Sequence, residues 1–402
     1  MSLFNAFNIL ISLSLATSQL AAASPIDSTG SGPTKPFLTL TATSATLHVP
    51  TKHQWEANSG YCGELSMIQA GLLHGVYISQ WDIRGNASPG VKQNDPTGKS
   101  QLLLGSNGDG RGKGKNANGQ GNDVTAAMAL GLTTVVWNAS IVDSEKYVMW
   151  IKKQVVSGNP VTMALYLNDP ESAKNEDEYD HIVAVTGIAS TSPTNLHDFT
   201  NFHKDDILTF DDHGVGLDLF PDRIQNTTGD PLKFSFSFGD LIKKRGDAAA
   251  ISRDLYSVPR VTGGKVWNYA VAVTGVADKN KDTYPIVVTT IMNHEPSKEM
   301  EDNNGFVGKR PAAVGITLTG TVYNLTPGVK YNLYTYIGGK DVGSGATAYQ
   351  VASVPTGEFN ANAKLAFKKM EVKIVEGNSF TFTEDVDSDE IRFYRAVLAR
   401  AP

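Results

Sequence analysis

Hydrophobic positions along the chain change from a helical to a β period at about residue 160. Apolar residues recur at helical spacing in Glu64–His74 and in Asp143–Val156, so each segment is expected to form an α-helix. Three later runs are short and rich in β-branched residues, which predicts strands at Pro160–Leu167, His181–Ile188 and Asp206–Phe210. Helices followed by strands are typical of an α+β domain.

The C-terminal part of the chain alternates almost entirely as β structure. From about residue 262, runs separated by Gly, Asn, Asp and Pro predict strands at 269–276, 286–291, 314–318, 329–336, 365–374 and 391–397. Short strands at such intervals indicate a sandwich similar to fibronectin type III or immunoglobulin-like modules. The expected fold class is therefore an α+β domain followed by an all-β sandwich.

The N-terminal residues have the pattern of an export signal. The apolar stretch Ile9–Leu15 precedes small residues that end at Ala23, although no Lys or Arg comes before it. We expect residues 1–23 to be a signal peptide, 24–45 a linker or short propeptide, 46–255 the α+β domain and 256–402 the sandwich. No later window reaches the roughly 18 apolar residues that a membrane span needs. The protein is thus expected to be secreted and extracellular, with no membrane span.

Composition limits which partners the chain can bind and which interactions can stabilise its fold. Of the 402 residues, 41% are hydrophobic and 19% charged, which excludes a disordered chain. The net charge of -6 gives no electrostatic case for nucleic acid as a partner. Cys62 is the only cysteine, so no internal disulfide can form. Four sequons could carry N-glycans if they lie on the surface: Asn86, Asn138, Asn226 and Asn324.

Two other segments could be taken for ligand sites, but we interpret neither of them as one. The glycine-rich segment Gly105–Gly121 lacks the GxxxxGK[ST] pattern of a phosphate loop and is expected to be a surface insertion. A group of His and Asp residues also lacks a recognised metal-ligand spacing and is interpreted as solvated loop residues: His197, His203, Asp205, Asp206 and His213. The sequence implies no cofactor and no metal.

Cys62 is the strongest candidate for a nucleophile. It immediately precedes the first predicted helix, within the segment Asn58-Ser-Gly-Tyr-Cys-Gly-Glu64. The positive end of the helix dipole and the unpaired N–H groups there favour a thiolate. Gly60 and Gly63 would let a substrate approach the backbone, and the Cys62 amide could donate to an oxyanion. The alternative is an inert free cysteine.

A general base and an orienting acid follow in the order that such a thiol needs. His181 opens a predicted strand, 119 residues after Cys62. The strand predicted at 206–210 ends at Asp211 and Asp212, and either carboxylate could hold the imidazole in the required tautomer. Taken singly, these side chains are more often structural. Together they predict a Cys-His-Asp triad.

These blocks carry a resemblance to a known family. GYCGE at a helix start, DHIVAVTGI and DILTFDDHG resemble the signature blocks of the papain-like cysteine peptidases, in particular the bacteriocin-processing (double-glycine leader) branch. The similarity covers roughly residues 50 to 245. It implies that Cys62 is the nucleophile, His181 the base and acid, and Asp211 the orienting residue, with Asp212 as competitor.

The chain departs from that family at the residue that completes the oxyanion hole. The family places a glutamine about six residues before the cysteine, where this chain has Glu56. A carboxylate would repel an oxyanion, so the role is assigned to Gln54, with Asn58 as runner-up. The expected activity is hydrolysis of a peptide or protein substrate. The alternatives are an acyltransferase that uses the same thioester, and a non-enzymatic secreted binding protein in which the sandwich holds a surface partner.

Overall fold

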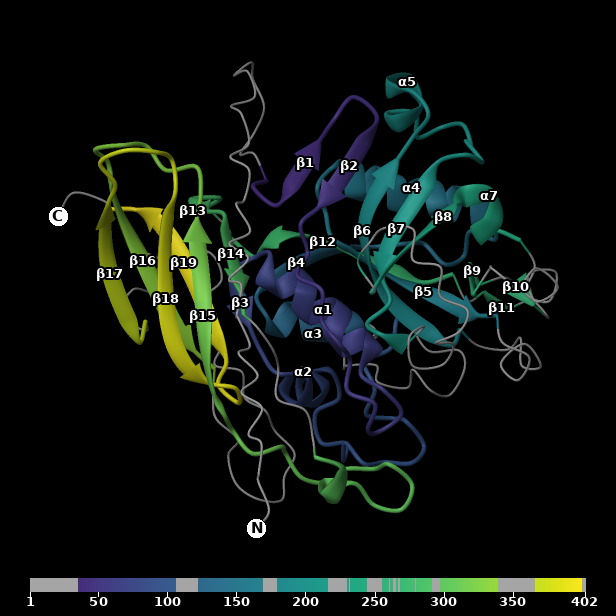
Figure 1. Cartoon of the computed structure of the whole chain (residues 1–402), viewed down its shortest axis with the longest axis horizontal. Helices are drawn as coiled ribbons and strands as arrows, with labels where there is room; N and C mark the ends of the chain where they lie inside the picture. Colours follow the sequence, from purple (N-terminus) through teal and green to yellow (C-terminus); the bar gives the residue numbers. More distant parts are fainter. Residues whose placement is uncertain are drawn as a thin grey trace, which may run out of the picture. The chain divides into compact units, whose positions relative to one another are not determined.

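A large antiparallel sheet forms the N-terminal half of the computed structural model (Figure 1). The sheet has nine strands in the order β1-β2-β6-β5-β12-β4, with β7 and β8 added beyond β6, and β9 added to β5. The strands are β1 (Leu38–Leu40), β2 (Ser44–Leu47), β4 (Leu132–Val136), β5 (Val161–Leu167), β6 (His181–Ala189), β7 (Ile207–Asp211), β8 (Lys233–Ser237), β9 (Tyr256–Ser257) and β12 (Ala270–Val276). The structure describes residues 35–105, 122–168, 179–215, 230, 232–243, 255–259, 261–262, 265–266, 268–278, 280–290, 297–338 and 366–399.

Helices flank this sheet, and side-chain caps fix the starts of α2 and α4. Asp143 accepts the main-chain N–H of Lys146, and Ser79 accepts that of Asp82, so each side chain satisfies an otherwise unpaired donor. Both predicted helices are confirmed as α1 and α4. The described helices are α1 (Cys62–Leu72), α2 (Gln80–Ala87), α3 (Asn122–Ala129), α4 (Ser144–Val156), α5 (Pro193–Leu196) and α7 (Phe238–Leu241). None of them is both long and apolar enough to cross a membrane.

Two further sheets form the C-terminal part, drawn in green and yellow in Figure 1. They pack face to face: the ring of Phe382 on β18 lies 4.9 Å from that of Tyr394 on β19, and the Tyr394 hydroxyl donates to Glu384. One sheet contains β3 (Val76–Tyr77), β13 (Thr283–Tyr284), β16 (Lys330–Ile337), β17 (Lys368–Lys373) and β19 (Arg392–Leu398); the other contains β14 (Ile286–Thr289), β15 (Gly315–Val322) and β18 (Phe380–Asp387). The remaining short elements are the hairpin of β10 (Val261–Thr262) and β11 (Lys265–Val266), and the 3-10 turn Lys298–Met300.

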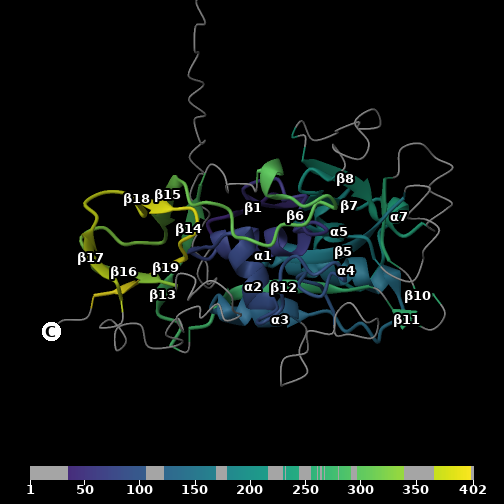
Figure 2. The same cartoon turned by 90° about the horizontal axis from the view of Figure 1, so that it is seen from below.

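The end of α1 joins the two parts of the chain (Figure 2). After α1 the chain turns at Gly75, whose φ of 70° lies in the left-handed region, and continues as β3 beside β19. A methyl group at Gly75 would lie 2.9 Å from the main-chain oxygen of Tyr394, so only glycine fits this approach. Leu65 and Ile68 of α1 belong to the same buried cluster as Leu333 of β16. The sandwich therefore shares a core with the helix that carries Cys62.

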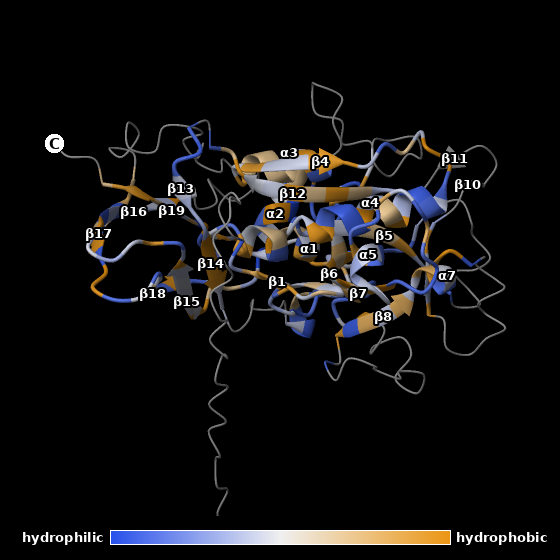
Figure 3. Ribbon diagram, turned by 90° about the horizontal axis from the view of Figure 1, so that it is seen from above, coloured by the Kyte–Doolittle hydropathy of each residue, from blue (hydrophilic) through white to orange (hydrophobic). Residues whose placement is uncertain are grey.

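Several predicted boundaries differ from the observed ones. The boundary expected at residue 256 would separate β12 from the nine-stranded sheet, where β12 pairs with both β5 and β4. The first four residues of β12 are buried and the last three half-buried, and the strand is partly in the hydrophobic colours of Figure 3. It joins the first sheet because that sheet offers two partners. The expected linker at 24–45 also contains β1 and the start of β2, which pair with each other.

The four sequons are not equivalent in the structure. Asn86 lies within α2 and is buried, so it does not meet the condition of a surface position that an N-glycan requires. Asn138 is exposed, and Asn324 is half-buried. Asn226 lies outside the described residues, as do the proposed signal peptide and most of the glycine-rich segment.

Candidate active site

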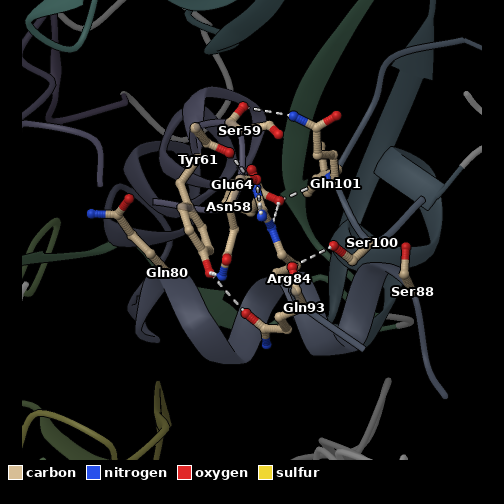
Figure 4. Close-up of polar contacts among 12 residues, drawn as sticks. Asn58, Ser59, Tyr61, Glu64, Gln80, Arg84, Ser88, Gln93, Ser100 and Gln101 are labelled. Atoms are coloured by element: carbon tan, nitrogen blue, oxygen red, sulfur yellow. Dashed lines mark hydrogen bonds and ion pairs between the residues drawn. The ribbon is translucent and has the colours of Figure 1, made fainter. Parts of the chain in front are cut away.

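A buried arginine organises the loop that leads into Cys62 (Figure 4). The Arg84 guanidinium donates from Nε to Glu64 Oε1 at 2.6 Å, from Nη1 to the Asn58 oxygen at 2.9 Å, and from Nη2 to the Gly60 oxygen. Its carbon lies 3.6 Å from the centre of the Tyr61 ring. Because both Arg84 and Glu64 are buried, removing one partner would cost about 3–5 kcal/mol. This network fixes the backbone immediately before the candidate nucleophile.

The Asn58 side chain is committed to this scaffold. Its Oδ1 accepts the N–H of Val307 at 2.7 Å, while its Nδ2 donates to the Tyr61 hydroxyl at 2.9 Å and to the Val307 oxygen at 3.1 Å. Asn58 also has a φ of 55°, in the left-handed region that Asn tolerates. With its amide engaged at both ends, Asn58 is a structural residue of the loop and has no donor left for an oxyanion.

Gln54 lies beside the loop that leads into Cys62, residues 58–61. A methyl group at Gly60 would lie 3.3 Å from the Gln54 amide nitrogen, so this side chain covers the backbone two residues before Cys62. The Gln54 main chain donates to the oxygen of His213 at 3.1 Å, which ties it to the turn after β7. The side-chain oxygen of Gln54 is buried and has no hydrogen-bond partner among the described residues. Glu56, six residues before Cys62, is exposed.

Cys62 begins α1, as the sequence predicts, but its environment keeps the thiol protonated. The side chain is half-buried and packs against Leu104, Ala164 and Ile182. Burial and, to a smaller extent, the neighbouring carboxylate of Glu64 raise the pKa of Cys62 to about 11. Hydrogen bonds from the N–H groups of Ile182 and Gly63 oppose the shift without reversing it. The expectation of a thiolate favoured by the helix dipole is therefore wrong for this conformation, because desolvation is the larger effect.

His181 opens β6 next to the same helix and is held by the main chain. Its Nε2 lies 2.9 Å from the carbonyl oxygen of Asp212, and since a carbonyl can only accept, Nε2 carries the proton. In the neutral ring, Nδ1 is then the nitrogen that can take up a proton. Burial, together with the nearby His213, lowers the pKa of His181 to about 3. Within the described part of the chain, no hydrogen bond joins His181 to Cys62.

Neither predicted carboxylate holds the His181 ring. The Asp211 carboxylate accepts Gln69 Nε2 at 2.5 Å and the N–H of His213 at 2.9 Å. The Asp212 carboxylate accepts the Tyr256 hydroxyl at 2.7 Å and the N–H of Gly214 at 3.0 Å. Asp211 lies close enough to raise the pKa of His181 electrostatically, against the larger effect of burial. The orienting acceptor predicted at Asp211 is thus the main-chain oxygen of the next residue.

A second cluster of polar side chains, which was not predicted from the sequence, lies next to Cys62 and includes Asp211. Ser66 Oγ lies 2.7 Å from His213 Nε2, and His213 Nδ1 lies 3.6 Å from Asp211 Oδ1. The four side chains of this group, which includes Gln69, are buried, so Ser66 is not an accessible nucleophile. The sequence spacing could have indicated this cluster, because Cys62, Ser66 and Gln69 lie on one helix face at i, i+4 and i+7. The cluster braces α1 against the end of β7.

The residues considered for a metal site are dispersed. His203 contacts Asp198 at 3.0 Å, and Asp206 is paired with Lys152 at 2.6 Å. No group of three or more His, Cys, Asp or Glu residues in the described ranges is placed to hold a metal ion. Comparisons with protein-family models, with curated proteins and with solved structures find no match to this chain.

Proposed function

We propose that this chain is a papain-like cysteine hydrolase that cleaves peptide or amide bonds through a thioester on Cys62. The observation that carries the proposal is the packing of the Cys62 side chain against the cluster that contains Ile182. Ile182 follows His181, so folding brings a thiol at the start of α1 to the first residues of the strand that carries the imidazole. A thiol and a base on separate rigid elements are what nucleophilic acyl transfer requires.

The reaction starts from a neutral pair. As Cys62 attacks the substrate carbonyl, its proton passes to Nδ1 of His181, while the hydrogen bond from Nε2 to Asp212 keeps the ring oriented. Gln54 and the main-chain N–H of Cys62 donate to the oxyanion. His181 returns the proton to the leaving amine. It then takes a proton from water, which attacks the thioester, releases the acid and restores the thiol.

The proposal includes export of the protein. The apolar stretch at residues 9–15 followed by alanines is the supporting observation, and a peptide or protein outside the cell is the corresponding substrate. The C-terminal sandwich would contact a surface partner and, through the core that it shares with α1, also support the site.

A second candidate is a non-enzymatic binding protein that retains a peptidase-like domain. It is favoured by the raised pKa of Cys62 and by the engagement of the His181 ring with Asp212. In that case the apolar surroundings of the thiol would serve packing alone.

Incubation with a defined peptide mixture, followed by mass spectrometry, separates the two candidates. The hydrolase predicts new peptide termini with the wild-type chain and none with Cys62→Ala or His181→Ala. His48→Ala, in which an exposed histidine is removed, is the matched control and should remain active. Amide products formed when a primary amine is added would identify the acyltransferase alternative. No new termini with any chain, while all variants unfold like the wild type, would establish the binding protein instead.

A further inference from the structure

A pocket beside β4 and α3 contains a buried carboxyl group that lacks a side-chain partner. The pocket has a volume of about 490 Å³, and the residues that line it include Gly105, Asp123, Val136, Trp137, Ala139 and Tyr269. Asp123 is the second residue of α3 and is only 1% exposed. Its Oδ1 accepts the N–H of Val124 at 2.7 Å, whereas Oδ2 is buried and has no hydrogen-bond partner in the described part of the chain.

This carboxyl group differs from the other buried acids of the described chain. Each of the other five is bonded to a side-chain donor: Glu64 to Arg84, Asp82 to Arg310, Asp206 to Lys152, Asp211 to Gln69, and Asp212 to Tyr256. Burial raises the pKa of Asp123 to about 7, and the N–H groups of Val124 and Gly105 oppose the shift. A buried carboxyl without a counter-charge is costly, which is typical of a site that a ligand completes.

The walls of the pocket suit a long side chain that ends in a cation. Val124 and Val136 provide aliphatic surface, while Trp137 and Tyr269 provide aromatic surface. Methylene groups pack on such walls, and a terminal ammonium or guanidinium group would reach the carboxylate through a charge-assisted hydrogen bond. The Gly105 backbone lies against the Tyr269 ring, where a methyl group would come within 2.5 Å of the ring, so only glycine fits at this wall.

One wall of the pocket packs against the same apolar cluster as Cys62. Tyr269, which lines the pocket, packs against the same apolar cluster as Cys62, together with Leu104 and Ile182. The strap from Leu102 to Gly105 runs between the two places: the Leu102 N–H donates to Glu64 at 2.8 Å, and Leu103 donates to Asn122 at 3.0 Å, next to Asp123. A peptide with its carbonyl near Cys62 could therefore place a neighbouring side chain in the pocket.

We propose that the Asp123 pocket binds a lysine or arginine side chain of a peptide and selects basic substrates for the Cys62 site. The selection of substrates rests on the proposed hydrolase, whereas the binding of the cationic side chain does not. The site has two requirements, an apolar channel and a carboxylate at its end, and each can be removed separately.

Binding is measured by calorimetry on the full Cys62→Ala chain with N-acetyl-lysine methylamide and with the uncharged norleucine analogue. The lysine compound should bind at least about tenfold more tightly, the usual effect of a hydrogen bond to a charged group. Asp123→Asn should remove that preference, and Asp205→Asn, at an exposed position, should retain it. Ala139→Trp, which fills the pocket and leaves Asp123 intact, should abolish binding of both compounds. Equal binding of the two compounds, or a preference that survives Asp123→Asn, would overturn the proposal.

Cleavage by the chain with Cys62 intact separates this proposal from the previous one. With both proposals correct, peptides that contain lysine are cut faster than norleucine peptides, and Asp123→Asn equalises the two rates. Selective lysine binding without any cleavage would retain the pocket and reject the hydrolase. Cleavage without a lysine preference would retain the hydrolase and reject the pocket.

Discussion

The imidazole of His181 donates to the main-chain oxygen of Asp212 at 2.9 Å, and not to either of the two carboxylates that end β7. A main-chain acceptor cannot be removed by a side-chain substitution. The orientation of the ring therefore depends on the backbone of the turn, which the Asp211 carboxylate supports by accepting the N–H of His213. Asp211 therefore supports the structure of the turn, whereas the hydrogen bond that orients the His181 ring does not involve the Asp211 side chain.

Asp211→Asn should reduce kcat by less than about tenfold, because the acceptor of the His181 proton stays in place. A carboxylate that itself holds the catalytic ring would give a loss of about 10⁴ on the same substitution. Steady-state kinetics on a peptide substrate measures the difference. Asn at 211 can still accept the N–H of His213, so the turn should fold. A loss of three or more orders of magnitude in a folded variant would assign the orienting role to the Asp211 side chain.

The thiol of Cys62 should react slowly in the native protein. With the pKa raised to about 11 from an ordinary 9.0, iodoacetamide at pH 8 should label the folded chain roughly hundredfold more slowly than the urea-unfolded chain. Because Cys62 is the only cysteine, the mass increase reports this site alone. Equal or faster labelling of the folded chain would show a thiolate stabilised by the fold.

Acid should destabilise the fold through two buried histidines. Burial is the main reason why the pKa values of His74 and His181 are lowered from 6.5 to about 3. As the pH falls from about 6.5 towards 3, the unfolded chain binds protons that the folded chain does not, so the free energy of unfolding decreases. Above pH 6.5 the contribution is fully retained. Urea unfolding of His74→Gln should show a slope smaller by up to about 1.4 kcal/mol per pH unit in that window. An unchanged slope would contradict the assignment.

Gln54 and Asn58 should respond to alanine substitution in opposite ways. Gln54→Ala should lower kcat by about 10² to 10³, as the loss of one oxyanion donor does, with little change in stability. Asn58→Ala should lower stability by about 1–3 kcal/mol, because it removes the partners of the N–H and the carbonyl oxygen of Val307. Urea unfolding and kinetics on both variants give the comparison. Full activity of folded Gln54→Ala would remove this residue from the site.

The sequence predicts those elements whose apolar pattern is strong. The helices α1 and α4 and the strands β5, β6 and β7 lie where periodicity places them. The strand β18 was not predicted, although Phe380 and Phe382 alternate with polar residues, because its outer face is polar and exposed. The Ser- and Thr-rich composition of the segment before residue 45 predicts a linker. The structure has β1 and β2 there, and they form because they pair with each other and β2 pairs with β6, which local composition does not show.

The elements that carry the candidate site could be predicted, but its electrostatics could not. Helix position alone favours a thiolate at Cys62, whereas the deciding effect is burial by Leu104, Ala164 and Ile182, which are 42 to 120 residues away in sequence. Arg84 likewise bonds to Glu64 and to the carbonyl oxygen of Asn58, which lie 20 and 26 residues before it in a stretch of sequence that shows no motif. Such contacts between distant segments exist only in the folded chain.

The central claim, that Cys62 is a nucleophile served by His181, is tested most directly with an electrophilic peptide ketone. A lysyl acyloxymethyl ketone carries a poor electrophile that needs both a positioned thiol and a neighbouring imidazole to react. We predict a single covalent adduct on Cys62 in the native wild-type chain and its loss in urea, in Cys62→Ala and in folded His181→Ala. Labelling that is absent from the native wild-type chain, or unchanged in His181→Ala, would contradict the account.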